Sequence, residues 1–93
     1  MEVEMLENEE AKMKFRIVGE GHTFSNALRK RLHQDDNIET AAYKIDHPLL
    51  SEPEFYVETE GEESVKEALV KAAEDLKEDY EEIEKELDQA LEQ

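Results

Sequence analysis

Several residue types are absent or scarce in this 93-residue sequence. It contains no cysteine and no tryptophan, and it has only three glycines and two prolines. The absence of cysteine excludes disulfide bonds and thiolate metal sites, and it fits the reducing cytoplasm in which we expect the protein to act. No apolar run approaches the roughly 20 residues needed to span a membrane. Residues 1–10 are acidic and lack the basic and apolar regions of a signal peptide.

Basic residues are also scarce relative to acidic ones. The chain has 11 Lys and Arg against 27 Asp and Glu, so its formal net charge is -16. Because phosphate contact needs clustered Lys and Arg, this charge argues against direct binding to DNA or RNA. It suits solubility and basic partners. We interpret most of the carboxylates as a solvated surface.

Hydrophobic periodicity predicts the fold. A chain of this length is expected to form one domain, residues 1–93, with a thin core of its own. Alternating apolar residues predict four strands, near residues 2–7, 12–18, 40–45 and 55–59. Helical spacing predicts one helix after the second strand and one after the fourth. The resulting ββαββα order predicts a two-layer α+β fold, with an antiparallel four-stranded sheet and both helices on one face.

The first helix is expected to follow the glycine-rich turn at residues 19–21. Thr23 is the predicted N-cap, because its hydroxyl can accept a hydrogen bond from an otherwise unpaired backbone N–H. Residues 35–37 are predicted to end the helix. The apolar residues at helical spacing between these points are Phe24, Ala27, Leu28 and Leu32.

A second, much longer helix is predicted from Ser64 to about residue 92. Ser64 and Glu67 form a capping-box signature, and no glycine or proline interrupts the segment. At roughly 1.5 Å per residue the helix would be about 43 Å long. A compact domain of this size is only about 32 Å across. Part of the helix is therefore expected to extend beyond its own domain.

One face of this long helix is apolar along its length. The residues follow heptad-like steps of four and three: Leu69, Ala73, Leu76, Tyr80, Ile83, Leu87 and Ala90. The C-terminal part of this face has too little sheet left to cover it. Leaving it in water forfeits about 1.5–3 kcal/mol for each large apolar side chain. A partner chain that covers the face is the simplest interpretation, and a frayed, partly exposed tail is the alternative.

Candidates for catalysis or metal binding are few. His22 lies near Glu20 and Thr23, but no serine or cysteine nucleophile has a recognisable setting. The glycine-rich turn is too short and too acidic to hold a phosphate. The three histidines match no familiar metal-site spacing. We therefore expect no catalytic residue, no cofactor and no metal, and we interpret His22 as a residue that orders a loop or contacts a partner.

Arg29, Lys30 and Arg31 form a basic cluster in the first helix. Cations near a helix C-terminus are favoured by the helix dipole, so the cluster has a purely local explanation. Contact with an acidic or polar partner surface is an equally good interpretation. In a helix the three side chains fan over more than half the circumference, so they cannot all serve one contact.

The segment from Glu20 to Leu32 resembles a known signature. It fits the pattern E-x-H-T-x-x-N-x-L-R-x-x-L of the small alpha-like subunits of multi-subunit RNA polymerases, with archaeal subunit L as the nearest branch. Residues 42–49, which end in His47-Pro48-Leu49, and residues 55–59 resemble later motifs of the same family. The order and spacing of these motifs extend the resemblance over nearly the whole chain.

The resemblance implies a non-catalytic assembly role in transcription. Such subunits pair with a larger alpha-like subunit, called D in archaea, and the heterodimer is a platform for the two large catalytic subunits of the nucleotidyltransferase. By position, the residues implied at the heterodimer interface are Phe24, Ala27, Leu28, Leu32, Leu69, Leu76, Tyr80, Ile83 and Leu87. The residues implied to order the loop or contact a large subunit are Glu20, His22, Thr23, Asn26 and Arg29.

A free-standing acidic module that covers basic surfaces is the alternative from another class. It accounts for the net charge but not for the motifs around His22 and His47. Salt distinguishes the two hypotheses, because exposed charges are screened while apolar contacts persist.

Overall fold

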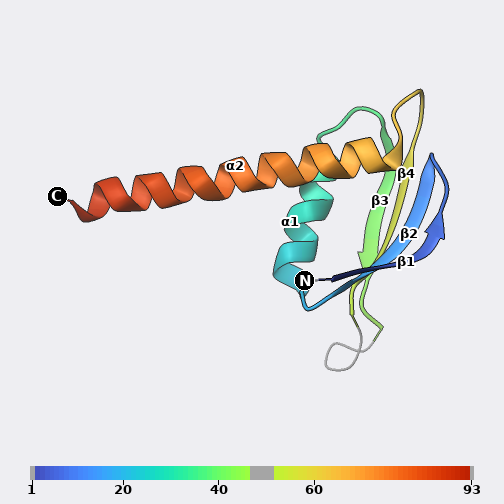
Figure 1. Cartoon of the computed structure of the whole chain (residues 1–93), viewed down its shortest axis with the longest axis horizontal. Coiled ribbons are helices and arrows are strands. Elements are labelled where there is room, and N and C mark those ends of the chain that lie inside the picture. The colour runs from blue at the N-terminus through green and yellow to red at the C-terminus, as the bar shows by residue number, and fades with distance from the viewer. Residues whose placement is uncertain (1, 47–51, 93) are drawn as a thin grey trace.

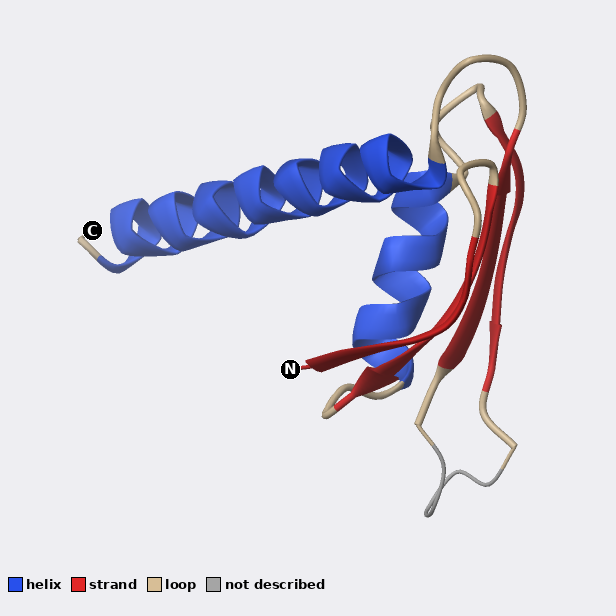
Figure 2. Cartoon of the chain, turned by 45° about the vertical axis from the view of Figure 1, so that its right-hand side comes forward, coloured by secondary structure: helices blue, strands red, loops and turns tan. Residues whose placement is uncertain are grey.

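The computed structural model describes residues 2–46 and 52–92, and in these ranges the elements follow the predicted order (Figure 1). The His47-Pro48 motif lies outside the described residues. The elements are β1 (Glu2–Asn8), β2 (Lys12–Val18), α1 (His22–Leu32), β3 (Ile38–Lys44), β4 (Glu54–Thr59) and α2 (Val65–Leu91). The predicted α+β class is confirmed, and both helices lie on one face of the sheet (Figure 2).

The sheet is antiparallel throughout, with the strand order β1-β2-β4-β3. Burial alternates along β2 and β4, because successive side chains of a strand point to opposite faces. Phe15 of β2 lies opposite Phe55 of β4, and Met13 lies opposite Val57. These two central strands therefore supply most of the floor on which the helices pack.

The core is small and centres on Phe55. Its ring is fully buried and stacks against Phe15 and Tyr43, with ring centroids 5.3 Å away in both cases. From the helices, Leu32 of α1 and Val65 of α2 are also fully buried. Aromatic pairs of this kind contribute about 0.5–1.5 kcal/mol beyond their buried area. The three rings therefore connect β2, β4 and β3 into one packed layer.

The bounds of α1 differ from the prediction at both ends. Gly21 is the N-cap residue and makes no side-chain cap bond, so the prediction of Thr23 as N-cap is wrong. Gly19 adopts a left-handed φ of 93°, and the first helical bond already runs from the Ser25 N–H to the Gly21 carbonyl. The helix ends at Leu32 because the next amides form tighter bonds, such as Asp35 N–H to the Leu32 carbonyl.

The long helix α2 agrees with its prediction. The Ser64 hydroxyl accepts a hydrogen bond from the Glu67 N–H at 3.1 Å, which caps the first turn. Val65, Ala68 and Ala72 are buried against the domain. Beyond residue 80 every described residue of the helix is exposed. The molecule measures 50 Å along its longest axis, and Figure 1 shows the C-terminal half of α2 extending away from the sheet.

Candidate partner interface

An apolar hollow lies between the sheet, α1 and the first half of α2. Its volume is about 190 Å³. Val3 lies opposite Ile17 and Met5 lies opposite Phe15 in the β1–β2 register, so these side chains extend the core face of the sheet outward. Neither helix covers that edge, since Val3 and Met5 are 55% and 44% exposed. The hollow is lined by Val3, Met5, Met13, Phe15, Ile17, Phe24, Leu28, Leu69, Ala73 and Leu76.

The apolar face of α2 continues from this hollow into solvent. Leu69, Ala73 and Leu76 line the hollow, and Tyr80, Ile83 and Leu87 follow on the same helical face. The last three are 55–57% exposed, which is unusual for side chains of this size. We call these six residues the apolar stripe. The hollow and the stripe together form one surface that residues 2–46 and 52–92 leave uncovered.

The residues expected at a partner interface divide into two groups. Leu32 is fully buried and Leu28 is 6% exposed, so both belong to this chain's own core. Leu32 has no exposed surface in this chain because it packs into the core from the end of α1, so we leave it out of the proposed interface. Phe24 is only partly buried and lines the hollow together with Leu28. The intermediate exposure of Ala27 leaves it at the margin.

The interface expected from the sequence includes no residue of β1. Alternation along the sequence places Val3 and Met5 on one face of a strand, but it does not indicate that this face is open. Every residue of β1 is exposed, because β1 is an edge strand that lies beyond the reach of both helices. The sequence carries no local signal for this, because it depends on where the helices pack: α1 packs against β3 and α2 against β4.

Two hydrogen bonds fix the segment that carries the family signature. His22 Nδ1 lies 3.0 Å from the Tyr43 hydroxyl, which connects the start of α1 to β3. Arg29 Nη2 donates to Asn26 Oδ1 at 2.7 Å within α1. Thr23 is exposed and Glu20 is half-buried. His22 therefore links the start of α1 to β3, and Asn26 and Arg29 are half-buried.

The basic cluster of α1 has more than one role. Arg31 Nη2 donates to Asp79 Oδ2 of α2, and Arg31 Nη1 donates to Gln34 at 2.7 Å. Asp79 marks the point where α2 leaves the domain, so Arg31 braces the projecting helix. Lys30 is exposed. The expectation that these cations serve different contacts agrees with this arrangement.

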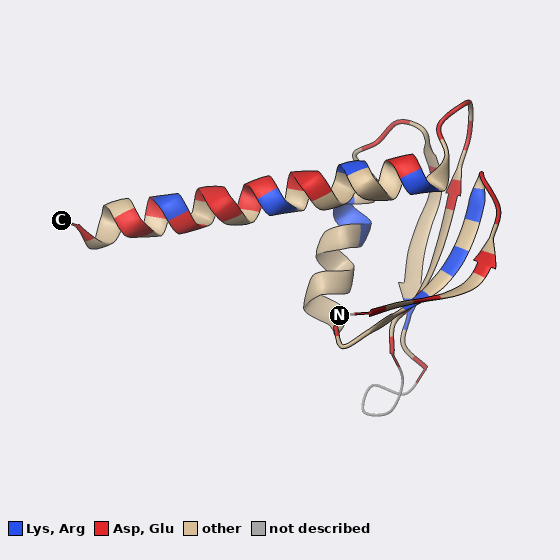
Figure 3. Cartoon of the chain, in the orientation of Figure 1, with Lys and Arg blue, Asp and Glu red and all other residues tan. Residues whose placement is uncertain are grey.

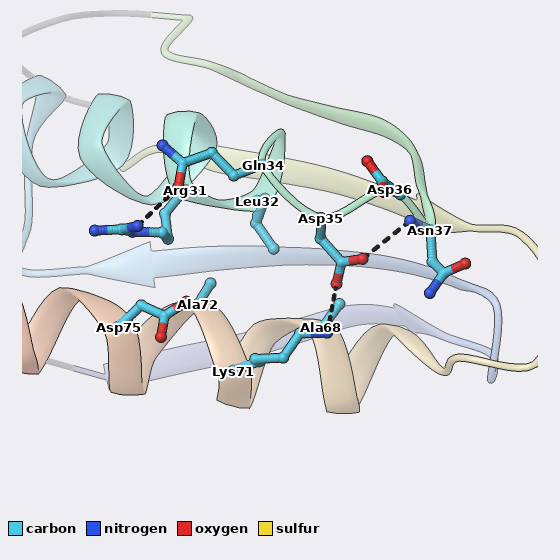
Figure 4. Close-up of a pocket in the computed structure, with 10 residues that line it drawn as sticks. All are labelled: Arg31, Leu32, Gln34, Asp35, Asp36, Asn37, Ala68, Lys71, Ala72 and Asp75. Carbon is cyan, nitrogen blue, oxygen red and sulfur yellow. Dashed lines mark hydrogen bonds and ion pairs between the residues drawn. The ribbon is translucent and has the colours of Figure 1, made fainter.

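A polar cluster fastens the turn after α1 to the first half of α2 (Figure 4). Asp35 accepts a hydrogen bond from the Asn37 N–H at 2.9 Å, and Lys71 Nζ lies 3.3 Å from Asp35 and 3.6 Å from Glu63. Burial opposes ionisation of Asp35, but the bonds from Asn37, Glu63 and Lys71 outweigh it and lower the pKa of this carboxyl. The bond to Asp35 raises the pKa of Lys71. We interpret the cluster as structural, because it holds the turn after α1 against α2.

The described residues contain no group of three or more His, Cys, Asp or Glu placed to hold a metal ion. Within residues 2–46 and 52–92, no helix is both long and apolar enough to cross a membrane.

Comparison with known proteins identifies the family. Residues 12–86 match the family described as the RNA polymerase Rpb3/Rpb11 dimerisation domain. The chain belongs to this family. The match runs from β2 through most of α2, and it includes every residue of the apolar stripe except Leu87.

The chain is similar to several archaeal proteins. It is 36% identical over 78 residues to DNA-directed RNA polymerase subunit Rpo11 of Thermococcus sibiricus, covering 82% of each chain. It is 36% identical to Rpo11 of Pyrococcus furiosus over 85 residues, 89% of this chain and 90% of that one. Subunit L of the RNA polymerase of Thermoplasma acidophilum has the same fold, with a TM-score of 0.81 over 95% of this chain and 86% of that chain at 20% identity.

Proposed function

We propose that this chain is a non-catalytic assembly subunit of an archaeal DNA-directed RNA polymerase, the counterpart of subunit L. It pairs with the larger alpha-like subunit in the cytoplasm, and the heterodimer is the platform on which the large catalytic subunits assemble. The observation that carries the proposal is the apolar stripe, which leaves the domain on α2 with Tyr80, Ile83 and Leu87 more than half exposed. The names of the relatives, subunits of the same enzyme, support the role.

The proposed heterodimer interface uses the open apolar surface. It consists of Phe24 from α1 and, on α2, of Leu69 and Leu76 beside the hollow and Tyr80, Ile83 and Leu87 beyond it. Val3 and Met5 of β1 are added to it, Leu28 and Ala27 stay at its margin, and Leu32 is left out. Exposed apolar patches of this kind mark protein interaction sites. A helix from the partner that lies along α2 would cover the stripe and close the hollow.

Light scattering after size exclusion tests the pairing. This chain is co-expressed with the larger alpha-like subunit of the same organism, and the mass of the complex is measured in low and in high salt. We expect a 1:1 complex that survives high salt, because apolar burial is not screened. A chain that stays monomeric beside the larger alpha-like subunit would instead favour the acidic-module hypothesis, as would a complex that dissolves completely in high salt.

The exposed and half-buried polar residues of the signature segment are proposed to contact a large catalytic subunit. Glu20, Thr23, Asn26 and Arg29 lie on the turn before α1 and along α1, and His22 orders its start through Tyr43. Arg29 retains donors beyond the one that it gives to Asn26, because a guanidinium has five. Such a group suits a carboxylate or a backbone carbonyl on another chain.

Substituting Arg29→Ala is expected to leave the heterodimer intact but to weaken its binding to the large catalytic subunits by about tenfold, as for one charged hydrogen bond. Co-purification of these subunits with the tagged heterodimer measures the effect. Lys30→Ala, which removes the exposed neighbouring cation, is the matched control and should have little effect. Loss of the heterodimer itself in Arg29→Ala would place Arg29 in the pairing interface instead.

A further inference from the structure

Acidic residues surround the exposed part of the apolar stripe. From residue 78 onward α2 has one basic residue, Lys85, and the acidic residues from there to the end of the chain are Glu78, Asp79, Glu81, Glu82, Glu84, Glu86, Asp88 and Glu92. Figure 3 shows Asp and Glu along the whole projecting helix, while the Lys and Arg of the sheet lie mostly on β2. The negative charge of the chain is therefore concentrated on the part that leaves the domain.

Some of these carboxylates border the stripe directly. A groove on α2 is lined by Asp79, Glu82 and Glu86 together with Ile83 and Leu87. On the other side of the stripe, Glu84 follows Ile83 at the next position of the helix. With 3.6 residues per turn, Glu84 and Glu86 lie on opposite flanks of the stripe. Any helix that packs on Ile83 and Leu87 will bring its own flanking side chains close to these two carboxylates.

In the part of the chain that the structure describes, Glu84 and Glu86 form no ion pair. Arg31 pairs with Asp79, but among the described residues no Lys or Arg pairs with Glu84 or Glu86. The cations of β2 are engaged elsewhere, as Lys14 pairs with Glu54 at 3.6 Å and Arg16 pairs with Glu4 at 3.4 Å. Glu84 and Glu86 are therefore available to a complementary charge on another chain.

We infer that the projecting half of α2 selects its partner by charge: it binds a helix whose apolar face is flanked by Lys or Arg, and it rejects a second copy of itself. A second copy would place acidic flanks against acidic flanks in either orientation, and charges at such flanking positions determine which helices pair. The inference rests on the proposed function, because it specifies the chemistry of the partner that covers the apolar stripe.

Charge reversal on the two faces of α2 tests the inference. One variant carries Glu84→Lys and Glu86→Lys beside the stripe. The control carries Glu78→Lys and Glu81→Lys, which point away from the stripe, and it changes the net charge by the same amount. The dissociation constant for the larger alpha-like subunit is measured for the wild type and both variants at 0.1 M and 1 M salt. The Debye length falls from about 10 Å to about 3 Å between these conditions.

At 0.1 M salt we expect the dissociation constant of the stripe-side variant to rise by about tenfold, because attraction is replaced by repulsion at two positions. The control is expected to stay within about twofold of the wild type. At 1 M salt the three proteins should converge. Equal effects of the two variants would overturn the inference, as would a loss that persists at 1 M salt. If the wild type itself fails to bind the larger alpha-like subunit, the proposed function fails as well.

A separate experiment on the chain alone tests whether it rejects a second copy of itself. The wild type alone is expected to be monomeric at 0.1 M salt in sedimentation equilibrium, and its self-association should strengthen as salt screens the acidic flanks. A tight homodimer at 0.1 M salt that weakens with added salt would contradict the inference even if the larger alpha-like subunit binds.

Discussion

Replacing Tyr80, Ile83 and Leu87 together by serine is expected to abolish binding to the larger alpha-like subunit while the domain remains folded. All three side chains are more than half exposed in the free chain, so their removal takes little from its own core. In the complex each is expected to contribute about 1.5–3 kcal/mol by burial. The dissociation constant should therefore rise at least about a thousandfold. Isothermal titration with the larger alpha-like subunit measures the change.

The matched control for this variant carries serine at Glu74, Glu78 and Glu81. It has the same number of helix substitutions, but on the face of α2 away from the stripe. Its binding should differ from that of the wild type by only a few-fold, and circular dichroism should show both variants helical. Binding that is undiminished in the stripe variant would remove the apolar stripe from the interface.

Replacing Phe55 by alanine is expected to leave the isolated chain only marginally stable. Phe55 is fully buried between Phe15 and Tyr43, and the substitution of a buried phenylalanine by alanine costs about 3–5 kcal/mol. Domains are typically stable by about 5–15 kcal/mol, and a domain this small lies near the lower end. Urea unfolding followed by circular dichroism should show the loss. Leu91→Ala, at a position 82% exposed, should change the unfolding free energy by less than about 0.5 kcal/mol.

A midpoint for Phe55→Ala close to that of the wild type would contradict the placement of Phe55 at the centre of the core. Addition of the larger alpha-like subunit should partly restore folding of the variant, because a partner that binds only the native state stabilises it by mass action.

The sequence predicted the strands and the long helix because their periodicities are strong. Lys12–Val18 agrees with β2 at both ends, and the capping box at Ser64 placed the start of α2 to within a residue. The projection of α2 beyond the domain could be predicted from its length, because a helix of that length is longer than the diameter of a compact domain of this size. These features depend only on local spacing and chain length.

Periodicity could not distinguish the two apolar surfaces of the protein. It identified Leu28 and Leu32 as one face of a helix, but that face packs on this chain's own sheet, while Tyr80 and Ile83 remain open. The difference depends on which residues of the sheet lie beneath each helix, and this is set by contacts distant in sequence. The ion pair of Arg31 with Asp79 and the contact of His22 with Tyr43 also join residues that are distant in sequence, so periodicity could not predict them either.

Hydrogen exchange of α2 tests the central claim most directly. In the free chain the backbone amides of residues 80–91 have no tertiary cover and should exchange faster than those of β4. Binding of the larger alpha-like subunit is expected to slow exchange across residues 80–91 and along β1, which borders the hollow, with little change in β3 at the opposite edge of the sheet. If that subunit binds and residues 80–91 remain as unprotected as in the free chain, the apolar stripe is not the dimerisation surface.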